Sequence, residues 1–170
     1  FAYFTEVGKL DIEKSLLERR RDKLQIIWCA RFINWKHPEL PVLLAKSLIQ
    51  SGRDNFEIKM IGANTTPLWK KIQKIIFKKK LQQYIQLTGG ITNVEVLRTM
   101  QRSNVLLFTS DRNEGWGAVL NEAMSAGCAC VASNEIGAVP YLIKHDENGL
   151  IFKSKSLQSL FDQVSKLYDD

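Results

Sequence analysis

Short apolar runs alternate along the chain with longer segments in which apolar residues recur at helical spacing. The apolar runs have the length of strands and predict six buried strands, at Leu24–Cys29, Phe56–Gly62, Tyr84–Leu87, Val105–Thr109, Cys128–Ala132 and Leu150–Phe152. Strands that alternate with helices indicate an α/β fold with a doubly wound, parallel, six-stranded sheet of the Rossmann-like kind. We predict the strand order 3-2-1-4-5-6.

Turn and capping residues set the expected limits of the helices. The helix after the first strand has Pro38 or Pro41 in its first turn, where proline is tolerated, and ends at Gln50 before Gly52. Other helices are expected to begin at Thr66 with Pro67, at Asn93 as a cap, near Gly117, at Ala138 and after Ser154, and a short helix is expected over 11–21.

The length and composition indicate one ordinary globular domain. The chain has 170 residues, of which 45% are hydrophobic and 25% charged. We expect residues 1–22 to be the remnant of an interdomain linker with a short helix, and residues 23–170 to form the domain. The chain has no initiator Met, no signal-peptide layout and no apolar run of the ~20 residues that span a membrane. It is therefore expected to begin inside a longer protein.

The three cysteines and the two histidines suggest no metal or disulfide chemistry. Cys29, Cys128 and Cys130 all fall in predicted buried strands and have no metal-ligand spacing, so we expect reduced core thiols in a cytoplasmic protein. His37 and His145 lie in expected loops and are interpreted as ordinary solvated side chains.

The formal net charge of +6 is unevenly distributed. The segment around Trp69 places apolar residues at helical spacing, so its six lysines belong on the other face of an amphipathic helix, at Lys70, Lys71, Lys74, Lys78, Lys79 and Lys80. A solvated face is the default interpretation; peripheral contact with anionic membrane lipids is the sharper one. Nucleic acid is not an expected partner, because no aromatic platform or DNA-reading motif accompanies the charge.

The stretch from Ser110 to Ser133 carries the main candidate chemistry. It predicts the end of a strand, a glycine-containing loop, a helix and a further strand, with Glu114 in the loop and Glu122 in the helix. Free backbone N–H groups at the start of this helix, over residues 117–120, favour an anion such as phosphate. The two carboxylates suit sugar hydroxyls, and a nucleotide-activated sugar offers both parts.

Several motifs in order and spacing resemble those of retaining glycosyltransferases with the GT-B fold, family 4 type (glycosyl transferases group 1). The segment EGWGAVLNEAMSAGCACVAS resembles the family's signature of two glutamates separated by seven residues, and CARFINWK, QLTGGI, NVLLFTS, IGAVPYLI and ENGLIF resemble its other conserved elements. The resemblance covers roughly residues 24–152. It implies that the chain is the C-terminal, donor-binding domain, one half of a GT-B fold, and that the N-terminal acceptor domain is absent from it.

The resemblance also implies roles for individual residues. Arg31 and Lys36 bind the donor diphosphate, where they stabilise the leaving nucleotide, and Glu114 contacts the donor sugar as the third catalytic residue. Binding roles for the rest of the donor are implied for Gly115, Trp116, Gly117, Val119, Leu120 and Glu122, and for the base at Thr88, Gly89, Gly90 and Ile91.

Three positions depart from the family pattern and one preserves an aromatic. Ala30 and His37 stand where the family has glycines, which narrows the expected diphosphate loop, and Tyr141 replaces a glutamate. Trp116 stands in place of the more usual Phe.

The activity that the resemblance implies is hexosyl transfer from a UDP- or GDP-sugar with retention of configuration, in polysaccharide biosynthesis, with the isolated domain inactive alone. No cofactor is expected, and no metal site is predicted, because the family needs no metal held by an Asp-x-Asp motif and the chain has no such motif. A nucleotide-sugar epimerase of GT-B fold and a non-catalytic nucleotide-sugar-binding module remain alternatives. A dinucleotide oxidoreductase is disfavoured, because residues 30–36 contain no glycine after the first strand.

Overall fold

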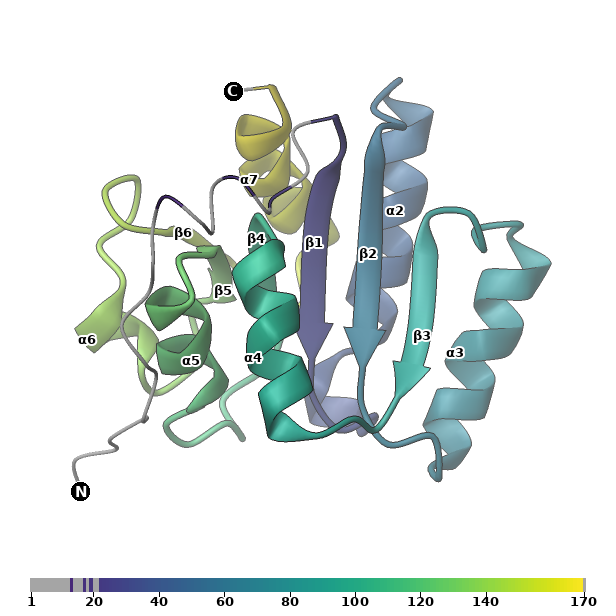
Figure 1. Ribbon diagram of the computed structural model, residues 1–170, viewed down its shortest axis with the longest axis horizontal. Helices are drawn as coiled ribbons and strands as arrows, with labels where there is room; N and C mark the ends of the chain where they lie inside the picture. The colour runs from purple at the N-terminus through teal and green to yellow at the C-terminus, as the bar shows by residue number, and fades with distance from the viewer. Residues whose placement is uncertain (1–12, 14–16, 18, 20–21, 170) are drawn as a thin grey trace.

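The computed structural model describes residues 13, 17, 19 and 22–169, and within them a sheet carries helices on both faces (Figure 1). The six strands are β1 (Leu24–Cys29), β2 (Phe56–Ile61), β3 (Ile85–Gly89), β4 (Val105–Phe108), β5 (Ala129–Ser133) and β6 (Leu150–Phe152). The α-helices are α2 (Glu39–Gln50), α3 (Pro67–Lys78), α4 (Asn93–Arg102), α5 (Val119–Ser125), α6 (Val139–Leu142) and α7 (Leu157–Asp169), and η1 (Asn34–Lys36) is a 3-10 turn. The linker and helix expected in 1–22 lie outside the described residues, apart from positions 13, 17, 19 and 22.

The sheet has the predicted topology. All neighbouring strands are parallel, in the order β3-β2-β1-β4-β5-β6. Ile26 in the middle of β1 pairs with Ile58 of β2 on one side and with Val105 of β4 on the other. The winding direction therefore reverses between β1 and β4, and ligands of such sheets bind beyond the carboxyl ends of the strands at this point.

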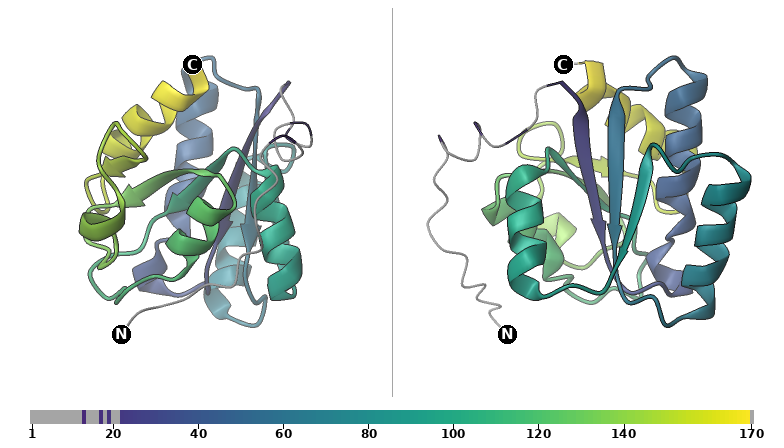
Figure 2. Two further views of the ribbon diagram at one scale, coloured as in Figure 1. Left: turned by 60° about the vertical axis from the view of Figure 1, so that its left-hand side comes forward. Right: turned by 45° about the vertical axis from the view of Figure 1, so that its right-hand side comes forward.

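Alternate residues of the central strands enter two separate cores. Ile26 and Trp28 of β1 point into the core under α2, α3 and α7, whereas Ile27 points into the core under α4, α5 and α6. Figure 2 shows α2 and α7 on one side of the sheet and α4 on the other. Burial on both faces explains why β1 and β4 are nearly continuous apolar runs. No helix among the described residues is long and apolar enough to cross a membrane.

Several predicted boundaries shift by one or two residues. Thr92, not Asn93, caps α4: its hydroxyl accepts from Glu95 N–H while the Glu95 carboxylate accepts from Thr92 N–H, which forms a capping box. β5 starts at Ala129, because Cys128 N–H still donates to Ala123 and closes the turn after α5. β3 runs from Ile85 to Gly89, one residue later at its start and two residues later at its end than predicted.

Candidate functional site

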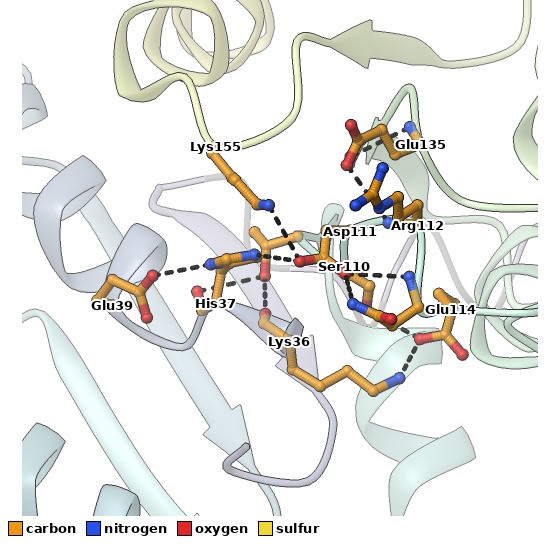
Figure 3. Close-up of polar contacts among 12 residues, drawn as sticks. Lys36, His37, Glu39, Ser110, Asp111, Arg112, Glu114, Glu135 and Lys155 are labelled. Atoms are coloured by element: carbon orange, nitrogen blue, oxygen red, sulfur yellow. Dashed lines mark hydrogen bonds and ion pairs between the residues drawn. The ribbon is translucent and has the colours of Figure 1, made fainter. Parts of the chain in front are cut away.

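Two loops meet beyond the carboxyl ends of β1 and β4 and form the candidate site (Figure 3). The cationic loop, residues 30–38, follows β1 and contains η1. The acidic loop, residues 109–118, connects β4 to α5. Because β1 and β4 are neighbours in the sheet, loops far apart in the sequence lie against each other.

Hydrogen bonds to main-chain carbonyls of the cationic loop hold the two loops together. Asp111 N–H donates to the Trp35 carbonyl (3.0 Å), and Thr109 Oγ1 donates to the Lys36 carbonyl (2.6 Å). Thr109 Oγ1 also accepts from Trp28 Nε1 (2.8 Å), and the Trp28 side chain is buried in the core. The cationic loop is thus anchored through the acidic loop to the interior of the domain.

Lys36 and Glu114 form an ion pair between the loops, and their side chains are only 11% and 12% exposed. Ser110 Oγ donates to the same Glu114 oxygen (2.9 Å), and the Lys36 ammonium lies 4.3 Å from the centre of the Trp35 ring. A cation and a carboxylate that the sequence predicts on converging loops are therefore in contact and largely shielded from water, where electrostatic interactions are stronger.

Arg31 lies at the same edge of the sheet, two residues after β1, and is exposed. Its guanidinium carbon is 6.0 Å from the centre of the Trp35 ring. Among the described residues it contacts neither Glu114 nor Glu122. The structure therefore places Arg31 beside the ion pair but not within it.

Glu122 enters the site from the first turn of α5. Burial raises the pKa of its carboxyl. Burial first, and then the Glu122 charge, raise the pKa of Cys29 at the end of β1 to about 11, whereas Lys36 acts in the opposite direction. Both charged groups therefore lie near enough to the Cys29 thiol to act on its pKa.

His37 is not the solvated loop residue that we predicted. Its side chain is 15% exposed, with Nε2 3.1 Å from Asp111 Oδ2 and Nδ1 3.0 Å from Glu39 Oε1. Its backbone adopts the left-handed region (φ 48°), which favours glycine, the residue that the family resemblance implies at this position. The His37 side chain instead links the cationic loop to Asp111 of the acidic loop.

Asp111 is the residue of this site that the sequence analysis missed. Burial opposes ionisation of its carboxyl, but hydrogen bonds from Asn113, His37 and Lys155 outweigh this effect and hold its pKa well below the usual range. Lys155 Nζ, from the segment before α7, lies 3.2 Å from Asp111 Oδ2. The one signal in the sequence was an acidic residue just after a strand end.

Close packing of the glycines shapes the acidic loop. Gly117 has φ 79°, and a Cβ there would lie 2.5 Å from the ring of buried Phe108. A Cβ on Gly137 would lie 1.9 Å from the Gly115 carbonyl oxygen, so the loop before α6 also requires glycine. Trp116 is 40% exposed, and its ring centroid lies 5.9 Å from that of the exposed Tyr141, with the two ring planes tilted by 30°.

The start of α5 corrects one prediction. Leu120 N–H was expected to be free for an anion, but it donates to the Gly117 carbonyl (2.9 Å), because the left-handed turn at Gly117 directs that carbonyl toward it. No partner is found for Val119 N–H among the described residues. The side chain of Leu120 is fully buried.

The turn after β3 lies apart from the Lys36–Glu114 pair. The Gly89 carbonyl accepts from Gly62 N–H (3.0 Å), and Gly90 lies near Ala63, where its absent Cβ would sit 3.7 Å from that backbone. Two strands separate β3 from β4, which at about 4.8 Å per strand spacing is about 14 Å.

Two of the residues predicted to border the base, one near the end of β3 and one just after it, border a cavity. Thr88 and Ile91 line a cavity of about 320 Å³ between the sheet and α4, and the Thr88 hydroxyl, which is buried, has no partner among the described residues. Among the described residues no group of three His, Cys, Asp or Glu side chains could hold a metal ion.

A family model for glycosyl transferases group 1 matches residues 11–170. The chain belongs to this family. Its structural similarity agrees: TarM superposes with a TM-score of 0.82 at 18% identity over 98% of this chain and 31% of TarM. WaaG, a glycosyltransferase involved in lipopolysaccharide biosynthesis, superposes with a TM-score of 0.73 at 19% identity. The superposition covers 96% of this chain and 42% of WaaG. At these identities the similarity shows a shared GT-B-type fold.

Curated relatives of this glycosyltransferase chain are distant. It is 25% identical to the N-acetyl-alpha-D-glucosaminyl L-malate synthase of Bacillus anthracis over 67% of the chain and 29% of the relative. It is 24% identical to a GDP-mannose-dependent alpha-(1-6)-phosphatidylinositol monomannoside mannosyltransferase of Mycobacterium tuberculosis over 69% of the chain and 31% of the relative. The chain thus spans about a third of the length of these relatives.

Proposed function

We propose that this chain binds the donor of a hexosyltransferase that uses a UDP- or GDP-sugar and retains anomeric configuration. The observation that carries the proposal is the contact between Lys36 and Glu114 at the switch point of the sheet. Family relatives supply the chemical class of ligand: one is GDP-mannose-dependent, and the Anabaena protein HepE, which shares the fold at 20% identity and a TM-score of 0.74, was solved with UDP and glucose.

In this proposal the cationic loop takes the diphosphate. Lys36 offers a compact ammonium and Arg31 a planar fork, and both approach the same oxygens from the β1 end. Positive charge there stabilises the nucleoside diphosphate as the bond to the sugar breaks. When the diphosphate takes Lys36, Glu114 is released from its ion pair and accepts hydrogen bonds from the sugar hydroxyls.

The other predicted site residues contact the remaining parts of the donor in this proposal. The backbone of Gly115, Trp116 and Gly117 borders the sugar, the Val119 and Leu120 segment faces the phosphate through the free Val119 N–H, and Glu122 takes the ribose hydroxyls. The base lies by the turn formed by Thr88, Gly89, Gly90 and Ile91. An extended nucleotide suits the separation of about 14 Å between the β3 and β4 loops.

The complete enzyme in this proposal places a second domain opposite residues 23–170, and that domain supplies the acceptor site. We propose a cytoplasmic enzyme of polysaccharide biosynthesis, with no cofactor and no metal in the transfer step. The free thiols Cys29, Cys128 and Cys130 agree with a reducing compartment. The chain alone is expected to bind the donor and to transfer little or no sugar.

Calorimetric titration of the chain with UDP and GDP tests the proposal. Arg31→Ala combined with Glu122→Ala is expected to weaken binding of the preferred nucleotide at least tenfold. The control combines Lys144→Ala with Glu147→Ala, which removes an exposed ion pair of the same formal charge balance and should leave binding unchanged. Equal binding by both double variants would count against the assigned site.

A further inference from the structure

The whole formal charge of the chain resides in one short segment. Residues 66–80 contain six lysines and no acidic residue, and the other 18 Lys and Arg residues are balanced by 18 Asp and Glu residues. All six lysines are exposed, and none forms an ion pair with another described residue. This segment, which is α3 with its two ends, therefore carries a dense excess of positive charge that attracts anionic partners.

The lysines share the outward face of α3 with one large aromatic side chain. Ile72 and Ile76 turn the opposite face into the core. Phe77 follows Lys74 by three residues and Lys70 by seven, so it lies on the lysine stripe, and it is 72% exposed. Both Figure 1 and the right-hand view of Figure 2 place α3 at the margin of the molecule, outside β3.

An apolar groove borders this face. It lies between α2 and α3, has a volume of about 430 Å³ and is lined by Val42, Leu43, Ile72 and Ile75 together with Glu39, Lys78 and Lys79. Exposed phenylalanine, an apolar groove and unpaired lysines thus lie side by side. Apolar groups beside cationic groups suit a surface that is anionic at the outside and apolar beneath.

We infer that α3 docks this protein on an anionic lipid bilayer. The lysines contact the headgroups, and Phe77 enters the boundary between headgroups and acyl chains. This mode differs from that of a free amphipathic helix, because the apolar face of α3 is occupied by the domain core. A nucleic acid is disfavoured, because Phe77 is the only exposed aromatic on the described part of α3 and cannot form a stacking platform for successive bases.

Co-sedimentation with vesicles tests the inference. The chain is expected to bind phosphatidylcholine vesicles that contain 30% phosphatidylglycerol, on the order of several-fold less at 0.3 M than at 0.05 M salt, and not to bind pure phosphatidylcholine. One lysine near an anionic surface contributes about a fivefold change in affinity. Lys70→Gln with Lys74→Gln should therefore weaken binding about twentyfold, whereas Lys144→Gln with Lys153→Gln, an equal loss of charge elsewhere, should change it less than threefold.

Phe77→Ala separates a bilayer from another polyanion. The variant should bind the anionic vesicles roughly fivefold more weakly and a soluble polyanion, single-stranded RNA or polyglutamate, as well as the unaltered chain does. Equal vesicle binding by the two double-lysine variants, or vesicle binding indifferent to Phe77 and weaker than binding of the polyanion, would overturn the inference. The double variant at Lys70 and Lys74 should titrate with UDP as the unaltered chain does, so failure here leaves the donor site unaffected.

Discussion

Replacing Asp111 by Asn is the sharpest test of how the site is held together. The Asp111 side chain is 7% exposed, and its two oxygens face different partners. Oδ1 accepts from Asn113 N–H (3.0 Å) and Asn113 Nδ2 (2.7 Å). Oδ2 lies 3.1 Å from His37 Nε2 and 3.2 Å from Lys155 Nζ. One carboxylate therefore joins the acidic loop to the cationic loop and to the start of α7 (Figure 3).

The cost of Asp111→Asn follows from these contacts. The amide oxygen can replace Oδ1 toward Asn113, but the amide NH₂ then faces Lys155, which is also a donor. At least one charge-assisted hydrogen bond is lost, and such a bond contributes about 1.5–3 kcal/mol. The Lys155 side chain is 57% exposed and can turn to water, which limits the penalty. We expect the free energy of unfolding to fall by about 3 kcal/mol at pH 7.

The same contacts give the effect a defined pH dependence. The folded state keeps the Asp111 pKa well below its ordinary value of 3.8. As the pH falls below about 4, the unfolded chain takes up a proton at this residue before the folded chain does, so the stabilisation is lost. The Asn variant lacks this group. The stability difference between the two proteins should be constant above about pH 5 and should shrink below pH 4 by about 1.4 kcal/mol per pH unit.

Urea unfolding followed by tryptophan fluorescence measures this difference. Asp54→Asn removes an exposed carboxylate with the same chemical change and should cost less than about 0.5 kcal/mol. If Asp111→Asn costs no more than the control at pH 7, or if the difference grows below pH 4, then Asp111 does not anchor the loops as an ionised group.

Two further predictions concern packing and thiols. Gly117→Ala should lower the free energy of unfolding by about 2–4 kcal/mol, because of the positive φ and the clash with Phe108. Gly52→Ala is the control, because Gly52 has a similar φ of 82° but open space around it, and should cost about 1 kcal/mol. Similar losses for the two variants would show that the clash with Phe108 does not contribute. The pKa of Cys29 is raised from 9.0 to about 11, so its thiolate at pH 8 is about a hundredfold less abundant than that of an ordinary cysteine. Cys29 in the folded chain should therefore react with a disulfide reagent at least about a hundredfold more slowly than in the urea-unfolded chain. Comparable rates would refute the argument that burial protects this thiol.

The fold followed from the sequence because its signal was local and repeated. Runs such as LQIIWC and VLLF are apolar on both faces, and the structure places them at the centre of the sheet. Errors arose where two neighbouring residues could serve the same purpose. Both Thr92 and Asn93 can cap a helix, and only Glu95, three residues after Thr92, decides between them by completing the capping box.

The site was predictable only in part, because its contacts join residues distant in sequence. The predicted strand order brings the loop of Lys36 and the loop of Glu114 together, and the two side chains contact each other in the structure. Nothing local to His37 reveals that it faces Asp111, a residue 74 positions away. Its left-handed backbone is likewise a property of the folded loop, which a histidine in the sequence does not reveal.

The site contains two separate sets of contacts, one that holds the loop backbone in place and one that pairs the charged side chains. His37, Asp111 and Thr109 hold the backbone of the cationic loop, and these contacts do not involve the ammonium of Lys36. Lys36 and Glu114 neutralise each other at the end of their side chains. A ligand that takes Lys36 would leave a buried carboxylate without its cation, which is costly unless the same ligand also donates hydrogen bonds to Glu114. In the proposed function a nucleoside-diphosphate sugar does both, whereas the nucleoside diphosphate that leaves brings no sugar hydroxyls to Glu114, so the site would favour the complete donor over its leaving group.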